Sequence, residues 1–162
     1  MTTDRTFAEL GVPAPLVRSL TTAGLTHPFP IQVETLPDTL AGRDVLGRGK
    51  TGSGKTLAFA IPLVSRLTEN RRQASRPSGL VLAPTRELAT QITAAIEPLA
   101  AAYGLKVTTI FGGVPQGRQV SALKAGVDIV VACPGRLEDL MRQRLISLDA
   151  VEEAFHKMER GE

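Results

Sequence analysis

A glycine-rich stretch with two Gly-Lys pairs, GRGKTGSGKT, is the part of the sequence whose residue types and spacing most directly indicate a chemistry. Residues 49–56 match the pattern G-x-x-x-x-G-K-[ST], with Gly49, Gly54, Lys55 and Thr56 in the defining positions. In such a loop the glycines let backbone N–H groups turn toward a phosphate, the lysine neutralises the β- and γ-phosphates, and the hydroxyl ligates Mg²⁺. The second Gly-Lys pair, Gly54 and Lys55, is therefore predicted to bind the phosphates.

The flanks of this loop distinguish it from a glycine-rich turn that matches the pattern by chance. The pattern requires a strand before it and a helix after it. A short apolar run at residues 44–46 precedes the loop, and an apolar stripe at helical spacing, residues 57–67, follows it. Lys50 falls among the variable positions and is expected to face solvent. The predicted nucleotide contacts of the loop are Thr51, Gly52, Ser53, Gly54, Lys55 and Thr56, with Thr56 as the metal ligand.

Length and composition limit the class of protein that carries this loop. A chain of 162 residues with 43% hydrophobic and 22% charged residues predicts one domain with a substantial core. No apolar run is long enough to span a bilayer, and the N-terminus lacks the apolar block of a secretory signal. The single cysteine excludes an internal disulfide, and these features together predict a cytoplasmic protein. The formal charge of +3 permits a nucleic-acid partner without requiring one.

Short apolar runs alternate along the chain with stretches of helical periodicity, which predicts an α/β fold with a parallel sheet. The predicted strands lie at residues 44–46, 80–83, 107–111 and 127–132. The second and the last of these runs are continuously apolar, as expected for strands buried on both faces. A second helical stripe spans residues 88–103. Pro62 and Pro98 interrupt the two helical stripes, so each helix is expected to be kinked or shorter than its stripe.

Several further motifs occur along the chain. The stretch GLTHPFPIQ at residues 24–32, with Phe7 upstream of it, resembles the Q motif and upstream aromatic residue of one known family, the DEAD-box RNA helicases. The motifs PTREL, GG and CPGR, at residues 84–88, 112–113 and 133–136, are similar to the family's PTREL, GG and TPGR motifs and occur in the same order. Together these motifs are far more specific than the phosphate loop alone.

The resemblance covers roughly residues 5–148 and implies the first of the two RecA-like domains of an ATP-dependent RNA helicase. It implies a RecA-like P-loop NTPase fold, ATP or ADP with Mg²⁺ as ligands, and RNA as the partner. A different P-loop enzyme, such as a small-molecule kinase, is disfavoured because it would lack the Q and PTREL motifs. A non-catalytic nucleotide- or RNA-binding fragment that uses the same surface is the other alternative.

The Q-motif resemblance implies that Gln32 recognises adenine. A glutamine amide offers one donor and one acceptor, which complement the N6 amine and N7 of adenine and reject guanine. Phe7 is expected to stack on the base. Taken without its neighbours, Gln32 would instead be an ordinary exposed polar residue at a helix start. Phe29 stands where this motif usually has threonine.

The resemblance also places an RNA backbone at the motifs that follow the predicted strands. Open α/β sheets bind ligands at the carboxyl ends of their strands. The Thr85 hydroxyl can donate to a phosphate, and Arg136 at a helix start can hold another. Arg86 can instead pair with an acid such as Glu87, and a plain turn accounts for the glycine pair almost as well. The predicted RNA contacts are Pro84, Thr85, Arg86, Gly112, Gly113, Pro134, Gly135 and Arg136.

The chain departs from the family pattern at two places near its C-terminal side. Cys133 replaces the usual threonine of TPGR, which removes a strong hydroxyl donor and predicts one weakened RNA contact. As a lone cysteine it is predicted to be a small buried residue rather than a nucleophile. The Asp-Glu-Ala-Asp sequence that the family carries on the strand after the TPGR helix is absent. The residues after Leu148 are predicted to be a charged, helix-like tail, with Glu152 and Glu153 on a solvated face.

These departures predict a chain that binds nucleotide but does not hydrolyse ATP, because the acids, a second RecA-like domain and its arginine finger are all absent. The sheet is expected to be incomplete at its C-terminal side. The strand edge exposed there predicts low stability as a monomer, or self-association that covers the gap. The predicted organisation is a Q-motif region with short helices at residues 1–43, a partial RecA-like ATP-binding domain at 44–148 and a divergent tail at 149–162.

Overall fold

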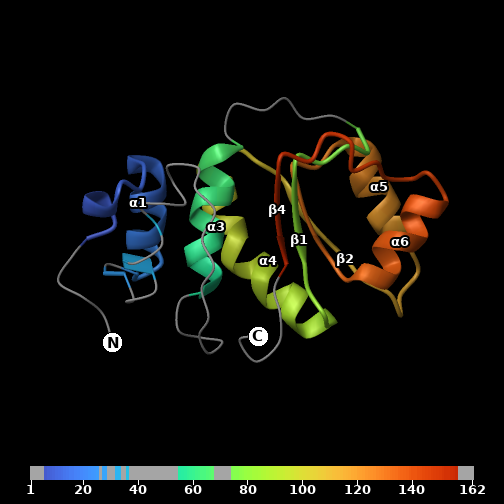
Figure 1. The fold of residues 1–162 in the computed structure, drawn as a ribbon, viewed down its shortest axis with the longest axis horizontal. Coiled ribbons are helices and arrows are strands. Elements are labelled where there is room, and N and C mark those ends of the chain that lie inside the picture. Colours follow the sequence, from blue (N-terminus) through green and yellow to red (C-terminus); the bar gives the residue numbers. More distant parts are fainter. Residues whose placement is uncertain are drawn as a thin grey trace.

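The computed structural model describes residues 6–25, 27–28, 32–33, 36, 55–67 and 74–156. Within these residues, helices lie on both faces of a parallel four-stranded sheet (Figure 1). Along the chain the elements are η1 (Ala8–Leu10), α1 (Ala14–Thr22), α3 (Lys55–Arg66), β1 (Gly79–Leu82), α4 (Arg86–Ala101), β2 (Val107–Ile110), α5 (Gly117–Ala125), β3 (Ile129–Ala132), α6 (Pro134–Arg142) and β4 (Glu153–His156). The predicted α/β fold with a parallel sheet flanked by helices is confirmed.

The strands are arranged in the order β2-β3-β1-β4, and every neighbouring pair is parallel. The two continuously apolar runs of the sequence form β1 and β3, which are the interior strands. All four residues of β3 are buried, whereas the first three residues of β2, at the edge, are only half-buried. The predicted bounds of these strands differ from the observed ones by one or two residues, and the strand expected at residues 44–46 lies outside the described residues.

Alternating side chains of the sheet fill two separate apolar clusters. Val81, Ile129 and Val131 join a cluster with residues of α3 and α4 on one face. Leu80, Val130 and Ala132 join a second cluster with residues of α5 and α6 on the other face. Figure 1 shows the corresponding layers, with α3 and α4 on one side of the sheet and α5 and α6 on the other. The period-two alternation of the strands thus supplies a core to each helical layer.

The N-terminal segment packs on the same core rather than forming a unit of its own. Phe7 and Leu16, which are 3% and 0% exposed, belong to the cluster that contains α3 and α4. The Ser19 hydroxyl donates to the carbonyl of Pro98 in α4 at 3.0 Å. Helix α1 ends at Thr22, and Gly24 follows it with a φ of +83°, in the left-handed region that glycine adopts most easily. The Leu25 N–H then donates back to the Leu20 carbonyl at 2.8 Å, closing the helix end.

The two prolines do not end their helices. Helix α3 continues past Pro62 to Arg66, and α4 continues past Pro98 to Ala101. Helix α4 nevertheless ends before Tyr103, the last residue of its predicted stripe. The helices are thus slightly shorter than their stripes.

The prediction of a helix-like tail is wrong, because residues Glu153–His156 form β4. This strand pairs with β1 from Gly79 opposite Glu153 to Leu82 opposite His156. The Glu152 N–H donates to the Ser78 carbonyl at 2.8 Å just before the strand begins. Since β1 has neighbours on both sides, the predicted open edge beside it does not exist. The stated reason for self-association is thereby removed, and self-association itself stays a prediction.

Candidate functional site

Three of the predicted motifs begin at the same edge of the sheet. The strand register sets Leu82, Ala132 and Ile110 level with one another. The next residues extend the ladder, since the Ala83 N–H donates to the Ala132 carbonyl at 2.9 Å and the Cys133 N–H to the Ile110 carbonyl at 2.8 Å. The loops that carry PTREL, GG and CPGR therefore leave the sheet side by side, at the carboxyl ends of parallel strands.

The PTREL loop leads directly into α4, with Thr85 as the N-cap. Its backbone is extended, with φ −132° and ψ 158°, and its hydroxyl oxygen accepts from the Leu88 N–H at 3.1 Å. A hydroxyl that accepts one hydrogen bond keeps its own proton for another acceptor. Pro84 beside it is exposed. The first amides of α4 and the Thr85 hydroxyl thus offer donors at this edge of the sheet.

The side chain of Arg86, in the PTREL motif, extends to the GG loop and stacks on an aromatic ring there. The central carbon of its guanidinium is 4.5 Å from the centroid of the Phe111 ring. Within the described part of the chain, Arg86 makes no ion pair and donates no hydrogen bond. The predicted alternative, an ion pair with Glu87, is therefore not what holds this side chain. The Phe111 ring positions the guanidinium of Arg86, and the N–H groups of that guanidinium remain available to a ligand.

Gly113 provides the room that Arg86 occupies. Its φ is +81°, and a Cβ atom added there would lie 3.2 Å from Nη1 of Arg86. At Gly112, in contrast, an added Cβ would meet nothing within 4 Å. A plain turn explains the positive φ of Gly113, whereas the close approach shows that the glycine also accommodates the arginine of the neighbouring loop.

The guanidinium of Arg136 donates its hydrogen bonds to the segment that follows β2. Its Nη2 donates to the Val114 carbonyl at 2.7 Å, and its Nη1 donates to Oε1 of Gln119 at 3.1 Å. The Nε2 of Gln119 in turn donates to the Phe111 carbonyl at 3.0 Å. In this conformation Arg136, on α6, stabilises the GG loop through these hydrogen bonds. The prediction that Arg136 itself holds a phosphate stays a prediction.

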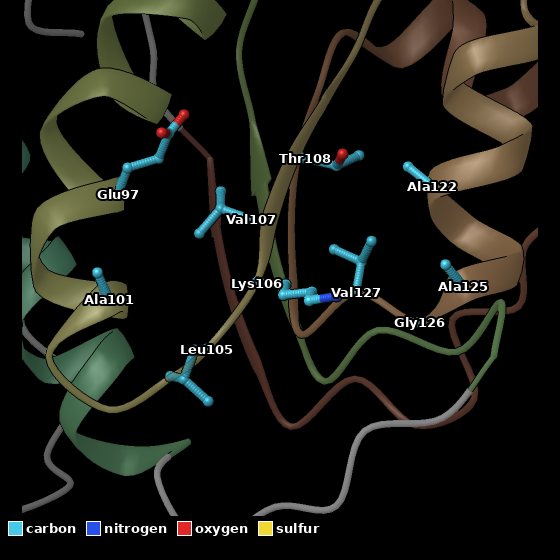
Figure 2. A pocket seen from close by; sticks show the side chains of 10 residues that line it. All are labelled: Glu97, Ala101, Leu105, Lys106, Val107, Thr108, Ala122, Ala125, Gly126 and Val127. Carbon is cyan, nitrogen blue, oxygen red and sulfur yellow. The ribbon is translucent and has the colours of Figure 1, made fainter.

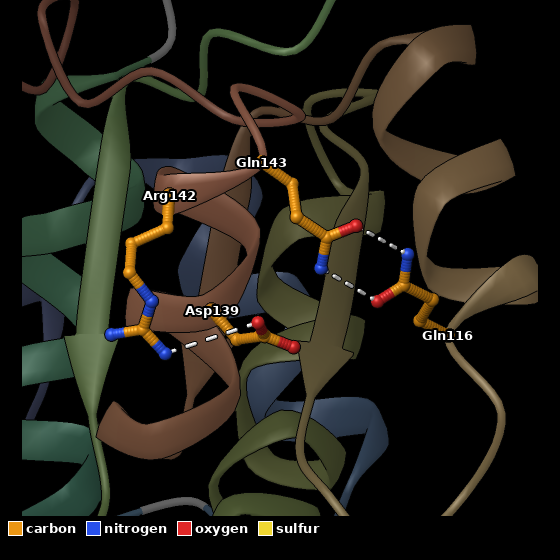
Figure 3. A network of polar contacts seen from close by, with 4 residues as sticks. All are labelled: Gln116, Asp139, Arg142 and Gln143. Atoms are coloured by element: carbon orange, nitrogen blue, oxygen red, sulfur yellow. Dashed lines mark hydrogen bonds and ion pairs between the residues drawn. The ribbon is translucent and has the colours of Figure 1, made fainter.

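A second contact ties the start of α5 to the end of α6. Gln116 and Gln143 exchange two amide hydrogen bonds, at 3.0 and 3.1 Å (Figure 3). Asp139 and Arg142 form an exposed ion pair at 3.9 Å on the same helix. The segment from Phe111 to Gln116 is therefore held to α6 at both of its ends. Sequence reasoning missed Phe111, Gln116, Gln119 and Gln143, because none of these long-range contacts has a local sequence signal.

Cys133 lies half-buried at the start of α6. Burial raises the pKa of its thiol, the carboxylate of Glu87 raises it further, and the guanidinium of Arg86 partly offsets the increase. A thiol with a raised pKa is mostly protonated near neutral pH and is a poor nucleophile. Cys133 is thus less buried than predicted, whereas its raised pKa supports the prediction that it is not a nucleophile.

The structure describes only part of the predicted nucleotide site. Gln32 is helical and 0% exposed, which excludes the alternative of an ordinary exposed glutamine. Phe7 has its ring in the core, so its stacking on a base stays a prediction. Helix α3 begins at Lys55, directly after the phosphate loop, as the motif requires. The side chains of Lys55 and Thr56 lie outside the described part, as do the whole residues Thr51, Gly52, Ser53 and Gly54.

Two grooves lie away from these motifs. Figure 2 shows the first, of about 380 Å³, with Glu97 and Ala101 of α4 on one side and Ala122 and Ala125 of α5 on the other. It borders the start of β2, at the opposite end of that strand from Gly112 and Gly113. The second, of about 490 Å³, is lined by residues before β1 and after α6. Neither groove contains a predicted site residue.

Comparison with known protein families identifies the family of this chain. The family model of the DEAD/DEAH box helicases matches residues 29–156. The chain belongs to this family. This DEAD-box chain is 42% identical over 154 residues to the ATP-dependent RNA helicase RhlB of Sodalis glossinidius, an alignment that covers 93% of the chain and 37% of that helicase.

Solved structures agree with the family assignment. The crystal structure of the RNA helicase Prp28 from Chaetomium thermophilum bound to ADP superposes with a TM-score of 0.87 at 37% identity, over 94% of this chain and 38% of that one. A DEAD-box protein from Methanococcus jannaschii superposes with a TM-score of 0.84 at 34% identity, over 93% of this chain and 40% of that one. The RecA-like fold is thus confirmed, and the DEAD-box chain spans less than half the length of each of these proteins.

Proposed function

We propose that this DEAD-box chain is the ATP- and RNA-binding portion of an ATP-dependent RNA helicase, whose whole form separates or remodels RNA strands. One observation carries the RNA part of the proposal. Three loops emerge side by side at the carboxyl edge of the sheet, and between them lies an arginine whose donors are open to solvent. A row of backbone amides, a hydroxyl and a guanidinium is the set of groups that contacts phosphates and sugars without reading sequence.

Each loop has its own part in the proposed RNA contact. Thr85 and the first amides of α4 donate to one phosphate, and Arg86 donates to the next. Gly112 and Gly113 let the sugar–phosphate backbone approach the end of β2. Pro134 and Gly135 form the turn into α6, whose Arg136 holds the GG loop in place.

The nucleotide part of the proposal rests on the phosphate-loop sequence, on the helix that begins at Lys55, and on the family. The Prp28 structure named above contains ADP, which supports a nucleotide in the same fold. Lys55 would neutralise the phosphates, Gln32 would read the adenine edge, and Phe7 would lie against the base. Among the described residues no group of three or more His, Cys, Asp or Glu side chains could hold a metal. By the phosphate-loop pattern, magnesium would be held by Thr56 and the phosphates of the nucleotide.

We also propose that this chain alone does not hydrolyse ATP. The strand that follows α6 reads EAFH, and the Asp-Glu-Ala-Asp sequence of the family does not occur in the chain. In the family that sequence supplies the carboxylates for the metal and for the attacking water, so we expect binding without turnover. No helix of the described part is long and apolar enough to cross a membrane. A cytoplasmic location is proposed from the single cysteine of the chain.

Calorimetric titration of ATP, ADP and GTP tests the nucleotide site. Lys55→Ala should weaken all three nucleotides, because it removes charge from the phosphates. Gln32→Ala should weaken ATP and ADP more than GTP, because only adenine offers the complementary edge. Gln91→Ala, at an exposed position on α4, is the matched control. Because Gln32 is buried, a thermal melt of each variant separates lost folding from lost binding. Equal losses for adenine and guanine nucleotides in a folded Gln32→Ala variant would contradict the assigned role.

A further inference from the structure

The Arg86 guanidinium is held in position by groups that leave its hydrogen bonds unused. It stacks on Phe111 at 4.5 Å, and its Nη1 lies against the open side of Gly113. Both of these neighbours belong to the loop after β2, whereas Arg86 opens α4. An exposed arginine that packs on an aromatic ring keeps its in-plane N–H donors directed away from the ring. Such an arginine has already lost much of the rotamer freedom that binding would otherwise remove.

Phe111 is in turn fixed by a chain of hydrogen bonds that begins at α6. Arg136 donates to Gln119, and Gln119 donates to the Phe111 carbonyl at 3.0 Å. Arg136 also donates to the Val114 carbonyl at 2.7 Å. These hydrogen bonds fix the backbone of Phe111 at the end of β2 without the help of Arg86, and the ring extends from that backbone to the guanidinium.

We infer that Phe111 is a positioning residue for RNA binding: its ring holds the Arg86 guanidinium beside Gly113, where that group contacts an RNA phosphate. This inference rests on the proposed function. In this proposal Phe111 acts through the arginine, since the guanidinium lies over its ring, rather than by stacking on a base. The two roles give different salt dependences, since a phosphate contact releases counterions and a stacked base does not.

The test is fluorescence anisotropy of a short, 5′-labelled oligouridylate, titrated with the full chain at several KCl concentrations. Phe111→Leu removes the ring and keeps an apolar side chain, and Phe111→Tyr keeps the ring. We expect Phe111→Leu to lose about two- to fivefold in affinity, as for an exposed cation–π contact. Its slope of log affinity against log salt should fall by up to about 0.7, the value of one phosphate contact on a single strand. Phe111→Tyr should bind as the unchanged chain does.

A double-mutant cycle and a spectroscopic signal complete the test. In an Arg86→Ala background, Phe111→Leu should cause no further loss, because the two residues act as one contact. The Arg86 side-chain protons should show an upfield ring-current shift that Phe111→Tyr retains and Phe111→Leu abolishes. If Phe111→Leu fails to fold by thermal melt, Phe111→Ile serves in its place, because a β-branched residue suits the end of a strand.

The contradicting outcomes are distinct from one another. Loss of affinity with an unchanged salt slope would make Phe111 a base platform and overturn its positioning role. Unchanged affinity of a folded Phe111→Leu variant would overturn that role while leaving the proposed RNA binding intact. An unchanged chain that binds no RNA at any salt concentration would overturn the proposed function and this inference with it.

Discussion

At the scale of single residues, two arginines predicted to do the same work have different surroundings. Arg136 donates to a backbone carbonyl and to an amide oxygen, so its charge is used within the molecule. Arg86 is exposed and touches only a ring and a glycine among the contacts described above. The difference follows from position, because α6 packs beside the GG loop and the start of α4 faces solvent. We therefore propose a role in stability for Arg136 and a role in RNA binding for Arg86.

Replacement of each arginine should separate these two roles. Arg136→Ala removes hydrogen bonds from a charged donor to partly buried acceptors, so the free energy of unfolding should fall by about 1–3 kcal/mol. Arg86→Ala is the matched control and should change it by no more than about 1 kcal/mol, the value of an exposed cation–π contact. Urea denaturation measures both. A larger loss for Arg86→Ala than for Arg136→Ala would contradict the assignment.

The thiol of Cys133 should be slow to react at neutral pH. Burial and the nearby Glu87 carboxylate raise its pKa, so little thiolate is present until the pH exceeds the ordinary range of a free thiol. Alkylation by iodoacetamide at neutral pH should be slower than that of a short peptide spanning Cys133, and its rate should rise at a higher pH than the peptide's. Alkylation faster than that of the peptide would show an activated thiol instead.

Restoring the hydroxyl that the family has at this position is a complementary change. Cys133→Thr supplies a stronger donor at the start of α6, and an added hydrogen bond is worth about 0.5–1.5 kcal/mol. We therefore expect up to about tenfold tighter binding of single-stranded RNA by anisotropy. Cys133→Ser supplies the hydroxyl without the methyl group and should give part of the gain. If neither variant binds RNA more tightly, the RNA does not contact residue 133.

Residue types and spacing predicted which side chains meet at this edge of the sheet, but not how they contact one another. The order of strand, motif and helix was sufficient to place Thr85, Gly113 and Arg136 together. The stack of Arg86 on Phe111 and the amide pair of Gln116 with Gln143 depend on how α4 and α6 lie against the loop after β2. Such contacts join residues far apart in the chain, and no local pattern encodes them.

At the scale of elements, β4 shows that pairing with a neighbouring strand can determine secondary structure. The tail carries consecutive acids and no continuous apolar run, so its pattern predicted a charged helix. Its actual conformation follows from the backbone groups that β1 offers on the side away from β3. Strand preference depends more on pairing partners than on the residue alone. The interior strands β1 and β3 were predictable because burial on both faces leaves a continuous apolar run.

Hydrogen exchange of β1 amides tests this correction. In a parallel ladder the N–H groups of successive residues point to opposite neighbours. Since the Ala83 N–H donates toward β3, those of Leu80 and Leu82 face β4. All of these amides should exchange slowly in the full chain. A chain shortened to end at Glu152 should expose Leu80 and Leu82 and leave Val81 and Ala83 protected. Fast exchange of Leu80 and Leu82 in the full chain would contradict the strand.

At the scale of the whole molecule, we propose that this chain binds its ligands without hydrolysing ATP. Phosphoryl transfer needs a metal-holding acid, an oriented water and a group that neutralises the transition state, and an arginine finger alone contributes about 10³–10⁵ in rate. Phosphate release from MgATP should therefore stay at background with and without RNA. The control is an intact two-domain relative assayed in parallel. RNA-stimulated release by a purified monomer of this chain would contradict the interpretation of its C-terminal residues.

The central claim is that the carboxyl edge of the sheet binds an RNA backbone. Amide chemical shifts of the isotope-labelled chain, followed as single-stranded oligouridylate is added, test it most directly. We expect the largest shifts on residues 85–86, 111–114 and 135–136, which the strand register brings together. Residues 105–108, beside the groove of Figure 2, should stay unchanged. Largest shifts at that groove, or no shifts in any of the three loops, would contradict the claim.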